Sequence, residues 1–138
     1  MIYGQSIGGA VSIYAAASAH KSDLKVSALI LENTFTSLPK LIPSVLPFLT
    51  RLVFLCTEIW DSEKEIRKVN VPILFLSGEK DALVPPSHMD RLHAICTEKE
   101  ANPRLKLSEM VKFKNGTHND TCMQPGYFNY IEKFIKKL

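Results

Sequence analysis

The sequence predicts an α/β fold in which a mostly parallel sheet is flanked by helices. Short apolar runs of strand length alternate along the chain with alanine-rich or amphipathic segments of helical length, which is the pattern of a parallel sheet. The length of 138 residues indicates one domain at most. A content of 46% hydrophobic and 22% charged residues is ordinary for a globular protein.

The first half of the chain is expected to supply two strands and two helices. Residues 1–3 form a short apolar strand, and the alanine-rich residues 8–19 have a helical composition. Residues 26–31 are almost continuously apolar, as in a strand that is buried on both faces. Ser37 is expected to cap a short helix that has Pro39 in its first turn.

The second half is expected to continue the alternation. Residues 71–77 and 110–113 are apolar runs of strand length. Between them, Ser87 is expected to cap a helix that ends near residue 97. Residues 127–138 close the chain as a helix with apolar side chains at helical spacing, namely Tyr127, Phe128, Ile131, Phe134, Ile135 and Leu138.

The middle of the chain is less regular. Residues 41–56 are the most apolar stretch, but they are short for a membrane span and are interrupted by Pro43, Pro47 and Arg51. This stretch is interpreted as an amphipathic or buried segment. Residues 58–69 are charged and are expected to be helical.

Charge and cysteine content exclude several classes of protein. The net charge of +3 is mild, and the basic residues form no stripe with aromatics, so nucleic-acid binding is not expected. No charged segment precedes Ile2, so no secretory signal peptide is expected. Three cysteines at wide spacings form neither a disulfide framework nor a zinc site, and are expected to be free, partly buried thiols: Cys56, Cys96 and Cys122.

Residues 4–8 match the G-x-S-x-G pattern of a nucleophile elbow around Ser6. In such an elbow the serine lies on a strained strand-to-helix turn, and side chains at Gly4 and Gly8 would collide with neighbouring chain. The N–H of Ile7 would then be an oxyanion donor. The pattern alone is weak, and its alternative is a glycine turn that only packs helix on strand. The alanine-rich helix that Gly9 opens favours the elbow.

Asp81 and His118 follow two of the predicted strands. Catalytic groups of open α/β sheets gather beyond the carboxyl ends of the strands, and the order Ser, Asp, His is the one this kind of site requires. Asp120 competes with Asp81 for the acid role, but it is two residues from His118 and would need an unusual turn. The alternative for Asp81 is a solvated turn aspartate. The remaining histidines are weaker candidates for the catalytic base than His118, because they are expected to lie on or beside helices: His20, His88 and His93.

With these residues placed, the chain resembles the α/β-hydrolase fold serine hydrolases. It is most similar to the subgroup that contains alpha/beta hydrolase domain-containing protein 13 and the fungal bud-emergence proteins. The serine elbow is shared by the whole superfamily, whereas the segment around His118 is distinctive for the subgroup. The matching segments span nearly the whole chain: residues 3–10, 31–35, 77–81, 84–86 and 116–121.

The resemblance implies a serine hydrolase that acts on carboxylic esters or thioesters through an acyl-enzyme. Ser6 would be the nucleophile, His118 the base and Asp81 the acid, and no cofactor or metal would be needed. The resemblance favours a small-molecule, lipid-like or acyl-protein substrate. A small lid is expected at about residues 36–66, with ordinary core packing of its apolar stretch as an equal alternative.

Members of this family carry a membrane-anchoring helix and several strands before the serine elbow. The chain is therefore expected to form the C-terminal half of the fold, with one sheet edge unpaired and without the second oxyanion N–H. The resemblance implies membrane association through the anchor. The alternative function is that of a non-catalytic fragment or binding-only isoform. Two N-x-T patterns, at Asn115 and Asn119, would matter if the domain faced a lumen, with Asn115 as the expected glycan acceptor.

Overall fold

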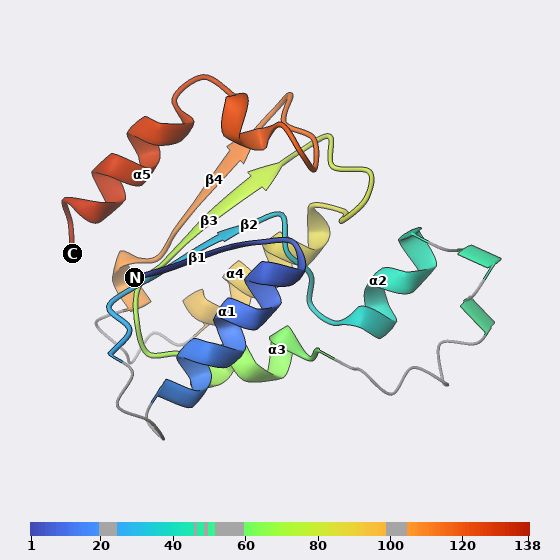
Figure 1. Ribbon diagram of the computed structural model, residues 1–138, viewed down its shortest axis with the longest axis horizontal. Coiled ribbons are helices and arrows are strands. Elements are labelled where there is room, and N and C mark those ends of the chain that lie inside the picture. The colour runs from blue at the N-terminus through green and yellow to red at the C-terminus, as the bar shows by residue number, and fades with distance from the viewer. Residues whose placement is uncertain (20–24, 46, 49, 52–59, 99–104) are drawn as a thin grey trace.

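The chain forms a four-stranded parallel sheet with helices on both faces (Figure 1). The computed structural model describes residues 1–19, 25–45, 47–48, 50–51, 60–98 and 105–138. The strands occur in the order of the chain, and the predicted α/β fold is confirmed. They are β1 (Ile2–Gln5), β2 (Leu29–Glu32), β3 (Ile73–Gly78) and β4 (Glu109–Phe113).

Helices complete each crossover between parallel strands. The α-helices are α1 (Ile7–Ser18), α2 (Leu38–Val45), α3 (Ser62–Glu65), α4 (Ser87–Thr97) and α5 (Tyr127–Ile135). Short 3₁₀ turns include η3 (Ile66–Lys68), η4 (Leu105–Leu107) and η5 (Thr121–Met123). Helices α1, α3 and α4 lie on one side of the sheet and α5 lies on the other (Figure 1).

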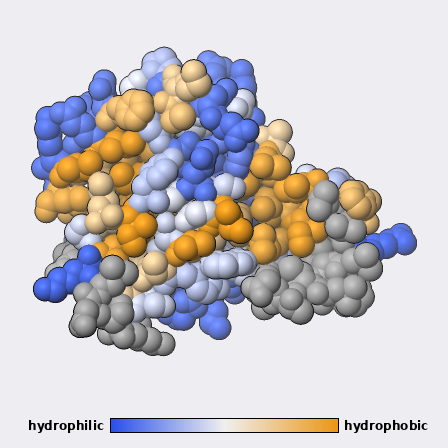
Figure 2. Space-filling view, viewed as in Figure 1, coloured by the Kyte–Doolittle hydropathy of each residue, from blue (hydrophilic) through white to orange (hydrophobic). Residues whose placement is uncertain are grey.

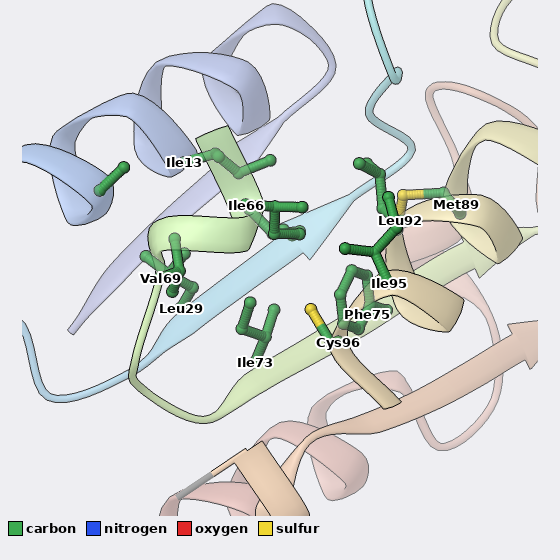
Figure 3. Packing of buried hydrophobic residues seen from close by; sticks show 12 residues of the cluster. Ile13, Leu29, Ile66, Val69, Ile73, Phe75, Met89, Leu92, Ile95 and Cys96 are labelled. Atoms are coloured by element: carbon green, nitrogen blue, oxygen red, sulfur yellow. The ribbon is translucent and has the colours of Figure 1, made fainter. Parts of the chain in front are cut away.

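Alternating side chains of the strands feed two separate cores. On one face, Leu29 and Phe75 pack with side chains of α1, η3 and α4, and this cluster includes the buried Cys96 (Figure 3). On the other face, Ile30 and Leu76 pack in a cluster with Phe113 of β4 and the buried side chains of α5, and the partly buried Cys122 packs against this cluster. Successive side chains of a strand point to opposite faces of the sheet. Because both faces are buried here, the strands are continuous apolar runs in the sequence. Cys56 lies outside the described residues.

Several predicted element boundaries are wrong, and prolines explain those at the starts of β2 and α4. Strand β2 begins at Leu29 and not at residue 26, because Pro72 lies opposite Ala28 and lacks the N–H that would extend the ladder. Ser87 does not cap α4. Pro86 already has helical backbone angles and occupies the capping position, so that Ser87 is the first helical residue.

The predicted short helix after Ser37 is present as α2, and the C-terminal helix is shorter than predicted. Helix α2 continues through Pro43, which lacks the N–H that would bond to the Pro39 carbonyl, and none of its residues is buried. Helix α5 ends at Ile135 rather than 138, and Phe128 on it is 71% exposed. The charged helix predicted at residues 58–69 is α3 followed by η3, and residues 58–59 lie outside the described residues.

Candidate active site

Ser6 occupies the turn between β1 and α1 in a strained conformation. Its φ of 53° and ψ of −123° lie in a region that residues with a side chain rarely adopt. Three hydrogen bonds hold the turn: the Ser6 N–H donates to the Glu32 carbonyl (2.9 Å), and the Ser6 carbonyl accepts from the Gly9 N–H (3.0 Å) and the Thr34 hydroxyl (2.7 Å). The predicted elbow geometry is therefore present.

Ile7 is the first residue of α1, directly after Ser6. The first N–H groups of a helix have no partner within the helix, and the helix dipole makes this end attractive to negative charge. The backbone N–H of Ile7 is thus at the position that the sequence predicted for an oxyanion donor.

The sequence predicted that side chains at both Gly4 and Gly8 would clash with neighbouring chain, and the structure shows such a clash at only one of the two. A Cβ at Gly4 would lie 2.3 Å from the Gly8 carbonyl oxygen, so glycine is required there. A Cβ at Gly8 would meet nothing within 4 Å in the described part of the chain, so the expectation of a clash at Gly8 is wrong. Gly9 is the second crowded position, because its Cβ would lie 2.5 Å from Cβ of Thr34.

Asp81 and His118 form a hydrogen-bonded pair across two loops. Nδ1 of His118 lies 2.7 Å from Oδ2 of Asp81, and the two side chains are 12% and 1% exposed. The other carboxylate oxygen of Asp81 accepts from the N–H groups of Leu83 and Val84, each at 2.8 Å. These bonds fix the carboxylate, and its contact with Nδ1 leaves Nε2 of a neutral His118 as the proton acceptor.

Asp120, the competing acid, is engaged in its own loop. Its Oδ1 accepts from the Thr117 N–H at 2.6 Å, and this bond lowers the pKa of the Asp120 carboxyl. The contact is a local turn motif, in which an aspartate side chain bonds to nearby backbone. The structure thus pairs Asp81 with His118, and Asp120 shapes the loop that carries His118.

The other histidines of the described residues serve in packing. His88 is buried, its Nδ1 lies 2.9 Å from the hydroxyl of Thr36, and burial lowers its pKa. His93 packs edge-on against Phe75, with ring centroids 5.3 Å apart, and burial lowers its pKa too. His20 lies outside the described residues.

The serine elbow is in direct contact with the segment that follows β4 and carries His118, residues 114–121, which is called the histidine loop below. The side-chain amide of Gln5, the residue before Ser6, donates to the His118 carbonyl at 2.8 Å. Because β1, β3 and β4 are parallel, the loops that carry Ser6, Asp81 and His118 leave the same edge of the sheet (Figure 1). The three residues predicted from the sequence are thereby gathered at one edge.

Known proteins resemble this chain in sequence. No protein-family model matches it. It is 47% identical over 137 residues to protein bem46 of Schizosaccharomyces pombe, 41% identical over 137 residues to the uncharacterized membrane protein YNL320W of Saccharomyces cerevisiae, and 36% identical over 151 residues to the alpha/beta hydrolase domain-containing protein WAV2 of Arabidopsis thaliana. These matches cover 98%, 98% and 99% of the chain. The chain spans less than half the length of these relatives, namely 42%, 45% and 46%.

Solved structures resemble the chain in fold. An esterase of Pyrococcus furiosus superposes with a TM-score of 0.75 at 15% identity, and an acylaminoacyl peptidase of Pyrococcus horikoshii with 0.74 at 20% identity. The superpositions cover 98% and 99% of this chain, and 52% and 23% of those proteins. The acyl-protein thioesterase 2 of Zea mays gives 0.58 at 15% identity, over 98% of this chain and 54% of that protein.

The chain is homologous to bem46 and WAV2 and has the fold of the α/β hydrolases. The resemblance inferred from the sequence motifs is therefore confirmed. None of the helices in the described residues is long and apolar enough to cross a membrane.

Sequence reasoning assigned no role to a polar cluster beneath the loop that carries His118. Glu32 and Asn33, at the end of β2, are 0% and 1% exposed. Glu32 accepts hydrogen bonds from the hydroxyls of Tyr3 and Tyr127, and Asn33 bonds to the loop of His118. The sequence carried two signals: a polar pair that directly follows a buried apolar strand, at the edge where functional groups gather, and the position of this pair within the family-like segment 31–35.

Proposed function

We propose that the protein is a serine hydrolase of carboxylic esters or thioesters that acts through an acyl-enzyme. The observation that carries the proposal is the Asp81–His118 pair, which shares one edge of the sheet with a strained serine elbow. A buried carboxylate on Nδ1 of a histidine, beside a serine at a helix N-terminus, is the arrangement that activates a serine hydroxyl.

Each of these residues has a defined role in the proposed reaction. Nε2 of His118 takes the proton of the Ser6 hydroxyl while Oγ attacks the carbonyl carbon of the substrate. The Ile7 N–H stabilises the negative oxygen of the tetrahedral intermediate, and Asp81 orients the imidazole and stabilises its cation. His118 then gives the proton to the departing alcohol or thiol. Water releases the acyl group from Ser6 by the same steps, and the route needs no cofactor.

The apolar surface of α2 supports a lipid-like or acyl-protein substrate. Figure 2 shows hydrophobic side chains gathered over α2, and Phe48 beyond its end is 76% exposed. Leu38 and Leu41 of α2 pack beside the buried Val84, whose N–H binds Asp81. We propose that α2 is the lid within residues 36–66. The end of that range belongs to the hydrophobic core, since Ile66 is 1% exposed.

We also propose that the full-length protein associates with a membrane. The support is the name of the Saccharomyces cerevisiae relative, the uncharacterized membrane protein YNL320W.

A fluorophosphonate probe tests the proposal in the full-length protein. We expect the probe to label Ser6 and expect Ser6→Ala to abolish labelling. Asp81→Asn should slow labelling at least about a thousandfold, because the wrong histidine tautomer is then favoured. Asp120→Asn is the matched control, and it should keep most of the labelling.

Two outcomes would contradict the proposal in different ways. If Asp81→Asn kept full labelling while Asp120→Asn lost it, the acid assignment would be wrong. If folded wild-type protein were not labelled, the non-catalytic, binding-only alternative would hold.

A further inference from the structure

We propose that Asn33 is a positioning residue that holds the loops of Asp81 and His118 in register with each other. The inference rests on the proposed function of Ser6, Asp81 and His118. Its basis is that one buried side-chain amide bonds to both loops at once, so that it sets how far apart the acid and the base lie.

The Asn33 amide uses both of its ends. Its Oδ1 accepts from the N–H of Gly78, at the end of β3, at 2.8 Å. Its Nδ2 lies within hydrogen-bond distance of three acceptors on the histidine loop: the carbonyls of Thr117 (3.2 Å) and His118 (3.3 Å) and the hydroxyl of Thr121 (3.0 Å). An amide nitrogen has only two hydrogens, so its donor capacity is fully used.

The Gly78 contact reaches the acid directly. Gly78 is three residues before Asp81, and its carbonyl accepts from the Asp81 N–H at 3.2 Å. The oxygen end of the amide therefore holds the start of the turn that carries Asp81, and the nitrogen end holds the backbone of His118. A displacement of either loop would change the 2.7 Å contact between Oδ2 of Asp81 and Nδ1 of His118.

Packing around the amide shows that the two loops approach as closely as their backbones allow. A Cβ at Gly78 would lie 2.5 Å from the Thr121 hydroxyl oxygen and 2.6 Å from the Gly116 carbonyl oxygen. A Cβ at Gly116 would lie 2.9 Å from the same hydroxyl oxygen. Thr121 is fully buried, and its hydroxyl donates to the Thr117 carbonyl at 2.6 Å while it accepts from Asn33.

The backbone of Asn33 is strained, as is that of Ser6. Its φ of 45° is in the left-handed region, which asparagine tolerates better than most residues. In the described part of the chain, the other non-glycine residues with a positive φ are Ser6 and Trp60. Strained residues persist where their surroundings over-determine them, and they cluster at functional sites.

Two substitutions at Asn33 separate the side chain from the backbone. Asn33→Gly removes the amide but suits a φ of 45°, so the fold should tolerate it. Asn33→Asp keeps an acceptor for the Gly78 N–H, but it places an oxygen against the carbonyls of the histidine loop. The matched control is Asn129→Asp, an exposed asparagine on α5. Thr121→Val removes one partner of the amide, and Thr121→Ser restores its hydroxyl.

The first measurement is the rate at which a fluorophosphonate labels Ser6 in the full-length protein, divided by the folded fraction of that protein. The second is kcat and KM on a short-chain ester. We expect Asn33→Gly and Asn33→Asp to lower the labelling rate and kcat about tenfold to a hundredfold, with little change in KM, because a small misplacement of the reacting groups is that costly. Thr121→Val should lower the rate less, and Thr121→Ser and Asn129→Asp should match the wild type within about twofold.

The result that would overturn the inference is an unchanged rate per folded molecule in Asn33→Gly, since a merely structural asparagine would lower only the folded fraction. If the Asn33 variants do not fold, the Thr121 pair decides, and equal rates for Thr121→Val and Thr121→Ser would overturn the inference. Failure of the proposed function itself has another signature, namely labelling that persists in Ser6→Ala.

Discussion

At the scale of single residues, the strained turn at Ser6 is shaped by two crowded glycines that are not symmetrical about Ser6. A Cβ at Gly4 or Gly9 would meet backbone or side-chain atoms at 2.3 and 2.5 Å, whereas a Cβ at Gly8 would meet nothing within 4 Å among the described residues. The G-x-S-x-G pattern correctly predicted the elbow and one of its two steric requirements. The second requirement arises between Gly9 and Thr34, whose hydroxyl also bonds to the Ser6 carbonyl. No local pattern reveals that contact.

This asymmetry predicts that substitution by alanine changes the free energy of unfolding differently at Gly4 and at Gly8. Gly4→Ala should lower the free energy of unfolding by about 2 kcal/mol or more, because a backbone carbonyl must move. Gly8→Ala should be neutral or raise it by a few tenths of a kcal/mol, since alanine is the better helix former. Urea unfolding measures both, and equal losses for the two variants would show that the steric account is wrong.

At the scale of elements, local patterns predicted which segments form strands and helices but not where these begin. The apolar runs of β2 and β3 and the alanine-rich α1 are visible without tertiary information, because strand burial and helix composition leave their mark in the chain. The starts of β2 and α4 depend on Pro72 and Pro86, which act on a neighbouring strand or on the turn before the helix. The effect of Pro72 requires knowledge of the strand register, and that of Pro86 requires the backbone angles of the turn.

The start of α3 offers a test of an element boundary. The side chain of Asp61 accepts from the Lys64 N–H at 2.9 Å, which caps the helix. We expect Asp61→Ala to lower the free energy of unfolding by about 1 kcal/mol, and Asp61→Asn to keep most of the stability. Chemical denaturation checks this. The labelling rate of Ser6 per folded molecule should stay unchanged, and a large fall in that rate would mean that α3 contributes to the site.

At the scale of the whole molecule, the sequence singled out the three residues proposed to react but not the residues that support them. Ser6, Asp81 and His118 carry signals in motif, strand position and chain order. Glu32 and Asn33 have partners as far as 95 and 88 residues away in sequence, on α5 and on the histidine loop. Sequence reasoning could place this polar pair at the end of a strand, but only the assembled fold shows what it binds.

The buried Glu32 cluster predicts how the stability of the protein depends on alkaline pH. The hydroxyls of Tyr3 and Tyr127 both donate to one carboxylate oxygen of Glu32. Burial of the hydroxyl end, and then the bond to Glu32, raises the pKa of Tyr3 from 10.0 to about 12, although half of its side chain is exposed. Burial and the same carboxylate raise the pKa of Tyr127 as well.

A tyrosine whose pKa is raised by folding holds its proton more tightly in the folded state. Between pH 10 and about 12 the unfolded chain loses these protons and the folded chain keeps them, so the free energy of unfolding must fall as pH rises through this range. We expect the urea midpoint of the full-length protein to fall across this window. Tyr127→Phe should flatten the fall, and the exposed Tyr130→Phe should not. An equally steep fall in Tyr127→Phe would assign the alkaline sensitivity to groups outside the Glu32 cluster.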